Sequence, residues 1–266
     1  MRNYILGRVV QTFPVVILVS LLIFAMFRML PGSFVDSLVD ESVEDFNREQ
    51  LMEQLGLDRP LHVQYLEWAW GLVRFDLGES LLTKYSISKE LAKRWPVTVE
   101  LTAWSLLYTI VLGIPTGMLA AFKQDTFIDY IARSFAVLGL SVPNFWIGVV
   151  LITMAAVHFG VLIRPDYISF IDSPWGNFKL MLIPALITAT SNTARIARMM
   201  RTTLLEVIRE DYIRTAYSKG LSPFVVMARH AGRNTMIPVV TILGLDFLQL
   251  ISGTVVMESL FDLPGI

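Results

Sequence analysis

The stretch that decides the fold class is VELTAWSLLYTIVLGIPTGMLAAF, from Val99 to Phe122. It contains a single charged residue, Glu100, near its beginning. A helix needs about 20 mostly apolar residues to cross the roughly 30 Å hydrocarbon core of a bilayer. Lipid offers no hydrogen-bond partners, so such a segment must satisfy its own backbone as a helix. Residues 99–122 therefore predict a membrane-spanning helix.

Four further stretches have the same character. The predicted spans are Val9–Leu30, Val99–Phe122, Phe135–Val157, Leu180–Met200 and Met236–Met257. Prolines inside these spans, such as Pro115, Pro143 and Pro184, are tolerated in membrane helices because neighbouring helices satisfy the freed backbone groups. The first span is too long for a signal-peptide core and is read as an uncleaved anchor. We expect an all-α integral membrane protein with five transmembrane helices in this chain.

Composition supports this class. Of the 266 residues, 54% are hydrophobic and only 17% are charged, which argues against a soluble globular protein. The net charge of -1 provides no basic surplus for phosphate contacts, so no nucleic-acid partner is expected. The absence of cysteine excludes disulfides, thiol catalysis and zinc sites built on cysteine.

The distribution of Lys and Arg predicts the orientation. Short flanks on one side carry most of them, whereas the opposite loop 158–179 has only Arg164 and Lys179. The positive-inside rule then places the N-terminus in the cytoplasm. The same rule makes the segment 199–235 cytoplasmic and the loop 31–98 external. The basic residues on the cytoplasmic side are Arg2, Arg8, Lys123, Arg133, Arg195, Arg198, Arg201, Arg209, Arg214, Lys219, Arg229 and Arg233.

Three regions follow from these spans. Residues 1–30 hold the N-terminal segment and first span, 31–98 an external loop with short amphipathic helices, and 99–266 the transmembrane core. In the loop, apolar residues recur every three to four positions between Arg48 and Phe75 and are interrupted at Gly56 to Pro60.

The cytoplasmic segment 199–235 is predicted to contain a short helix between two turn signals. The helix of the fourth span continues past Arg201, and a new element runs from Tyr212 to Lys219. Gly220 ends it as a glycine C-cap does, and Ser222-Pro223 begins the next helix. Such a compact projection fits a groove on another protein, with the apolar side chains of the short helix available for packing.

These residues resemble the EAA coupling motif of ATP-binding-cassette (ABC) importer permeases, in the dipeptide, oligopeptide and nickel branch. The matching run is Asp211-Tyr212-Ile213-Arg214-Thr215-Ala216-Tyr217-Ser218-Lys219-Gly220-Leu221-Ser222, with Arg229-His230-Ala231 and Ile237-Pro238 after it. Fragments along the rest of the chain, such as Leu55-Gly56-Leu57-Asp58-Arg59-Pro60, resemble the first permease subunit of that branch. Arg214 and Thr215 stand where the motif's name-giving Glu and first Ala would be.

The resemblance implies a type I importer permease with six spans, so a shortened chain is expected here. It implies a bacterial or archaeal plasma-membrane protein that works with ABC ATPase subunits, a second homologous permease and an external substrate-binding protein. Short peptides are the first expected cargo, with nickel chelates, glutathione or sugars as variants. Residues 211–222 would be the coupling helix that receives nucleotide-driven motion. The residues carried over to this role are Tyr212, Arg214, Thr215, Ala216, Lys219, Gly220 and Leu221.

Two polar residues in the spans are candidates for the translocation path. An unpaired carboxylate at mid-membrane costs about 2.5–3.5 kcal/mol on insertion scales, so Asp246 predicts either a water-lined path or a polar partner. Asn144 is a second path candidate. Glu258, at the external end of the fifth span, is expected to be solvated, and Glu100 to be structural.

No catalytic or cofactor motif is present. The sequence has no phosphate-binding Gly-x-x-x-x-Gly-Lys-[Ser/Thr] loop, and the histidines His62, His158 and His230 are scattered. We therefore expect no resident cofactor, no metal and no enzyme activity in this chain, with ATP hydrolysis on partner chains. An ion-coupled secondary transporter is the alternative function, although the sequence shows neither repeats nor several mid-membrane carboxylates.

Overall fold

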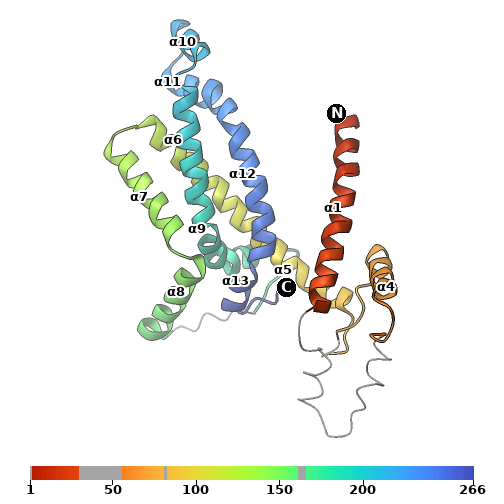
Figure 1. Ribbon diagram of the computed structural model, residues 1–266. Coiled ribbons are helices and arrows are strands. Elements are labelled where there is room, and N and C mark those ends of the chain that lie inside the picture. Colours follow the sequence, from red (N-terminus) through yellow and green to blue (C-terminus); the bar gives the residue numbers. More distant parts are fainter. Residues whose placement is uncertain (1, 30–55, 81–82, 161–165) are drawn as a thin grey trace. The chain divides into compact units, whose positions relative to one another are not determined.

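The computed structural model describes residues 2–29, 56–80, 83–160 and 166–266 (Figure 1). This described part is helical and contains no β-strand, only an isolated bridge between Glu79 and Ser86. The all-α prediction is confirmed. The chain divides into two compact units, Met1–Glu90 and Leu91–Ile266.

The first unit contains α1 (Arg2–Met29) and α4 (Leu61–Val73). The Tyr65 ring of α4 lies edge-on to Phe24 of α1 at 5.5 Å between centroids, and its hydroxyl lies 2.9 Å from Ser20 Oγ. Most apolar side chains of α1 are exposed all round, as expected for a helix surrounded by lipid. The predicted helix after Pro60 is confirmed, whereas Leu51 and Leu55 lie outside the described residues.

The second unit is built around one long helix, α9 (Pro174–Val207). Buried residues of α9 take part in each of the three hydrophobic clusters of the unit: Met181 in one, Leu204 in another, and Ile196 in the third. The helices packed on it are α6 (Ile114–Phe122), α7 (Phe127–Ser141), α8 (Asn144–Phe159), α12 (Gly232–Gly253) and α13 (Val255–Leu260).

Two π-helical segments join α-helices end to end. Thr109–Gly113 (η1) connects α5 (Ile87–Tyr108) to α6, and Val226–Ala231 (η2) connects α11 (Pro223–Val225) to α12. The chain is therefore helical without a break from Ile87 to Phe122, through α5, η1 and α6. This confirms the prediction of a helix over 99–122.

Three described helical stretches are long and apolar enough to cross a membrane: Asn3–Met29, Ile87–Phe122 and Pro223–Gly253. The pair α7 and α8 makes a fourth if the two together form one span. The predicted fourth span, Leu180–Met200, lies in α9. Helix α9 is long enough to cross a membrane but is not among these stretches, because Asn192 and the arginines that follow it lower the mean hydropathy. The described residues thus contain three or four candidate membrane spans, whereas the sequence predicted five for the whole chain.

The span predicted over Phe135–Val157 is broken into two helices, which could cross a membrane only as one bent pair. Helices α7 and α8 meet at 92° because the chain leaves the helical conformation at Val142, just before Pro143. The proline ring disfavours helical geometry in the preceding residue, and Val142 adopts an extended φ of -100° and ψ of 124°. Asn144 consequently lies at the first turn of a new helix rather than inside a continuous one.

The end of the predicted fifth span is also different. Helix α12 ends at Gly253, and α13 follows as a separate short helix. Glu258 was expected to be solvated, but its exposed fraction is 1%, and its Oε1 accepts a hydrogen bond from Thr254 Oγ1 at 2.8 Å. This carboxylate is therefore turned inward and bonded to its own chain.

Close approach of α6 to α9 depends on Gly117. A Cβ there would lie 2.5 Å from the carbonyl oxygen of Ala197 and 2.7 Å from Cβ of Met200. We expect Gly117→Ala to lower the free energy of unfolding by about 1–3 kcal/mol through overpacking. The measurement is the thermal unfolding midpoint of the purified protein in detergent.

The matched control is Gly244→Ala in α12, where a Cβ meets nothing within 4 Å. Removing a helical glycine from open space should be neutral or slightly stabilising. Equal midpoints for the two variants would contradict the close packing of α6 on α9.

Candidate functional site

The short helix α10 (Asp211–Ser218) lies at the end of α9 and forms the tip of the second unit (Figure 1). Helix α9 has 34 residues and is therefore about 51 Å long at 1.5 Å per residue. This length is well beyond the thickness of a hydrocarbon core. The surplus length carries α10 away from the membrane-spanning part. The predicted element, Tyr212 to Lys219, agrees with α10 to within one residue at each end, and Gly220 after it is left-handed with φ of +78°.

One face of α10 is anchored to its own chain. Ile213 and Ala216 are buried in a cluster with Leu204 at the end of α9 and with Val226 and Ala231 of η2. The hydroxyl of Tyr212 also accepts a hydrogen bond from Asn234 Nδ2 of α12 at 2.8 Å. Helix α10 is therefore held by contacts with both α9 and α12.

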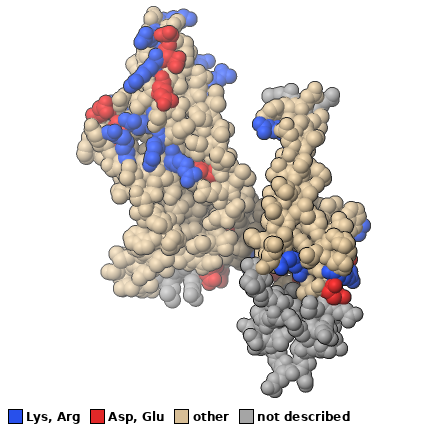
Figure 2. Space-filling view, in the orientation of Figure 1, with Lys and Arg blue, Asp and Glu red and all other residues tan. Residues whose placement is uncertain are grey.

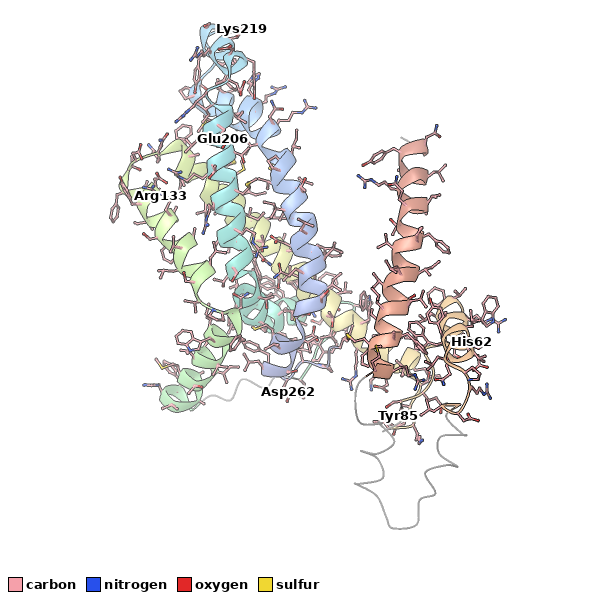
Figure 3. The ribbon with its side chains drawn as sticks, in the orientation of Figure 1. His62, Tyr85, Arg133, Glu206, Lys219 and Asp262 are labelled. Carbon is pink, nitrogen blue, oxygen red and sulfur yellow. The ribbon has the colours of Figure 1, made fainter. Side chains whose placement is uncertain are left out.

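The other face of α10 is open. Tyr212 and Tyr217 are about two-fifths exposed, and Arg214, Thr215 and Lys219 are exposed around them. Lys219 lies at the outer tip in Figure 3. Arg214 and Asp211 form an ion pair at 3.4 Å, but both side chains are largely in solvent, so the pair contributes little.

Of the apolar residues expected to be available for docking, only the two tyrosines face outward. Ile213 and Ala216 share the opposite face because they are three residues apart on the helix, and half-buried Leu221 packs on the same cluster. Among the predicted coupling residues, Ala216 and Leu221 thus position α10, whereas Tyr212, Arg214, Thr215, Lys219 and Gly220 are exposed.

A polar cluster lies between α9 and α12. Arg195 Nη1 donates to Asp246 Oδ1 at 2.6 Å, and Gln249 Oε1 lies 3.4 Å from the same nitrogen. Asp246 is fully buried, and two-fifths of the Arg195 side chain is exposed. Of the two roles left open for Asp246, the structure shows the pairing with a polar neighbour.

Asn144 lies at the same place in the fold. Its Nδ2 donates to the Thr188 carbonyl at 2.9 Å, and its Oδ1 accepts from Ser191 Oγ at 2.7 Å. Asn144, Ser191, Arg195 and Gln249 line a cavity of about 390 Å³ between α8, α9 and α12. Asp246 does not itself line it but holds Arg195 at its wall. The structure therefore places Asn144 at the wall of this cavity and Asp246 behind the wall, paired with Arg195.

Sequence reasoning missed the role of Arg195, which was counted only as a cytoplasmic charge. The structure places it inside α9, opposite Asp246 of α12. The signal was available: an Arg and an Asp both predicted inside helical spans are expected to pair, since an isolated charge in lipid is costly.

Another polar cluster lies at the end of the unit opposite α10. Glu100 accepts hydrogen bonds from Tyr167 Oη at 2.9 Å, the Phe170 backbone at 3.1 Å and Asn177 Nδ2 at 2.6 Å. Burial, reinforced by the Glu100 carboxylate, raises the pKa of Tyr167 to about 12, so its hydroxyl keeps donating throughout the physiological range. This cluster attaches the segment 167–177 to α5 and agrees with a structural role for Glu100.

Basic residues are concentrated at one end of the second unit. Figure 2 shows Lys and Arg over the region of α6, α7, α9 and α10, while the surface toward the opposite end is almost free of them. This is the asymmetry on which the predicted orientation rests.

Two family models match the chain. Residues 113–266 match the binding-protein-dependent transport system inner membrane component, and residues 1–102 match the N-terminal region of the membrane component of such systems. The chain belongs to this permease family. It is a multi-pass inner-membrane transport subunit and not an enzyme, and the alternative of an ion-coupled secondary transporter is disfavoured.

Relatives of this permease match over its whole length. It is 39% identical to a protein of Brucella suis biovar 1 named as a peptide transport system permease, covering 85% of that protein. It is 36% identical to the dipeptide transport system permease protein DppB of Escherichia coli K12, covering 86% of it. The di/tripeptide permease DppB of Pseudomonas aeruginosa is 34% identical, with 85% covered.

The Arg195–Asp246 pair makes a testable contribution to stability. Arg195→Met leaves a fully buried carboxylate without its partner and should lower the free energy of unfolding by up to about 3 kcal/mol. The double variant with Asp246→Leu removes both charges and should recover most of the loss. Thermal unfolding of the permease in detergent measures both.

Arg214→Met is the matched control, because its ion pair with Asp211 lies in solvent and should contribute under about 0.5 kcal/mol. If Arg195→Met unfolds no earlier than Arg214→Met, the pair does not hold α9 to α12.

Proposed function

We propose that this permease is one of two homologous transmembrane subunits of an importer for short peptides, driven by separate ABC ATPase subunits. Members of its family serve transport systems that depend on a binding protein, and relatives covering its whole length are named for peptide, dipeptide or di/tripeptide transport. An external substrate-binding protein delivers the cargo on the side opposite α10.

The observation that carries the proposal is that the same two helices connect α10 to the polar cavity. Leu204 of α9 and Asn234 of α12 hold α10 at one end of the unit. Arg195 of α9 and Asp246 of α12 are joined beside the cavity farther along the same helices. A force on α10 therefore has a continuous packed route to the cavity, as a coupling element requires.

In this mechanism the exposed face of α10 docks on an ATPase. Closure of the two ATPases displaces α10, and α9 and α12 shift together because both are attached to it. The cavity beside Asn144 then alternates between opening to one side and to the other. Nucleotide biases this equilibrium only through its different affinity for the two states.

The cavity has side chains suited to a peptide. Gln249 supplies an amide, and Asn144 Oδ1 and Ser191 Oγ each keep a lone pair that can accept from a peptide N–H. Arg195 is the cationic group at the wall, where a terminal carboxylate finds a partner. We assign this cavity to the translocation path, with Asp246 as the residue that positions Arg195.

Coupling through α10 predicts a specific effect at Gly220. Its φ of +78° strains a β-branched residue, while a Cβ there meets nothing within 4 Å, so Gly220→Val should misdirect α10 without a steric clash. We expect the ATP hydrolysis stimulated by binding protein and peptide to fall at least about tenfold in reconstituted vesicles.

Two controls isolate the backbone effect. Gly220→Asn should retain most of the stimulation, because Asn tolerates the left-handed conformation. Gly160→Val imposes the same strain, at φ of +64° and again with open space around the Cβ, but at the end of α8. Full stimulation in assembled Gly220→Val complexes would refute the coupling role of α10.

The proposed orientation is testable because the chain has no cysteine to remove. A cysteine at exposed Asp172 should react with an impermeant maleimide in intact cells. A cysteine at exposed Ser218 of α10 should react only after the membrane is opened. Labelling of Ser218→Cys in intact cells would place α10 outside and overturn the proposal.

A further inference from the structure

Two adjoining cavities lie on the face of α9 that points away from the proposed path. The larger, of about 570 Å³, lies between α6, α7 and α9, and the smaller, of about 160 Å³, continues from it. Thr116, Ala132, Ala136 and Ala197 line both, so they form one groove. On α9 the groove uses Thr190, Thr193, Ala194 and Ala197, whereas the path cavity uses Thr188, Ser191, Asn192 and Arg195.

The large part of this groove is apolar. Its walls include Leu112 and Leu119 from η1 and α6, Ile131 and Phe135 from α7, and Leu186 from α9. Phe135 has an exposed fraction of 70%, so apolar surface remains uncovered beside the groove. A ligand that fills this part must itself be apolar and elongated.

The small part is cationic. Arg133 of α7 and Arg198 and Arg201 of α9 line it, at the end of the unit that carries α10. Figure 3 shows Arg133 toward the same end as Glu206 and Lys219. Asp129 is the carboxylate beside them, and it forms two short hydrogen bonds with Arg201, of 2.6 and 2.7 Å.

This leaves an excess of positive charge. Arg133 lies 3.6 Å from the already engaged Asp129, and its guanidinium lies over the Tyr130 ring. Arg198 is exposed, and within the described part of the chain no carboxylate pairs with it. Arg133 and Arg198 are thus available to an anion at the mouth of an apolar groove.

We propose that this groove binds an anionic phospholipid, with an acyl chain between α6, α7 and α9 and the phosphate between Arg133 and Arg198. A lipid supplies both the apolar chain and the negative charge, in the order in which the groove presents their partners. Basic pockets between membrane helices on the cytoplasmic side bind anionic headgroups in this way. Only the leaflet assignment rests on the orientation proposed above.

The test uses the permease assembled with its natural partner subunits in nanodiscs of phosphatidylcholine containing phosphatidylglycerol. Native mass spectrometry then counts the phosphatidylglycerol retained after transfer to detergent. We expect Arg133→Gln with Arg198→Gln to lower retention at least about tenfold. The charge-matched control is Arg209→Gln with Arg229→Gln, two exposed arginines outside the groove, which should retain the wild-type amount.

A second variant tests the apolar part without changing charge. Ala132→Trp fills the groove that Ala132 lines, whereas Ser134→Trp places the same ring at an exposed position of α7 outside it. Retention should fall for Ala132→Trp only. Equal retention in groove and control variants would overturn the proposal.

Photocrosslinking identifies the occupant directly. With benzoylphenylalanine replacing Phe135, crosslinks to phosphatidylglycerol support the proposal. Crosslinks predominantly to the second permease subunit would overturn it, because a partner helix would then fill the groove. Neither readout depends on peptide uptake or ATP hydrolysis, so failure here and failure of the proposed transport function are distinguishable.

Discussion

The close packing of other helices on α9 is the constraint on which the second unit depends. Buried residues of this 34-residue helix take part in all three hydrophobic clusters. Small residues such as Gly117 and Gly139 let α6 and α7 approach its backbone. Close packing makes the core resistant to gradual deformation, so motion at one end of α9 is carried to the other. In the proposed mechanism, the same helix is both the core of the fold and the link between α10 and the cavity.

The sequence predicted what depends on local pattern. Apolar runs predicted the helix over 99–122 and the continuation of α9 past Arg201. The backbone preferences of Gly220 and Pro223 predicted where α10 ends. The bend between α7 and α8 was misjudged, because Pro143 is compatible with either a tolerated kink or a full break. Which one occurs depends on whether neighbours satisfy the backbone, and this is a tertiary property.

The candidate site was predicted only in part for the same reason. The motif identified residues 211–222, but the division of α10 into a buried and an exposed face depends on how Leu204 and Val226 meet Ile213. Asp246 was singled out from the cost of a charge in lipid, whereas its partner Arg195 was counted only as a cytoplasmic charge. Glu258 was misjudged because its burial depends on tertiary packing, in which its neighbours Met257 and Phe261 join the same cluster as residues of α9.

The two faces of α9 separate two chemistries that a transporter must keep apart. Polar side chains from Thr188 to Arg195 line the cavity proposed as the translocation path, while Thr190, Ala194 and Ala197 face an apolar groove. A helix turns about 100° per residue, so both sets fit within the same stretch of about three turns. A helix with this division cannot be uniformly apolar, and this is why the predicted fourth span has low hydropathy although it lies at the centre of the unit. The polarity that weakens its signal as a membrane span is the property that suits it to line a path for peptides.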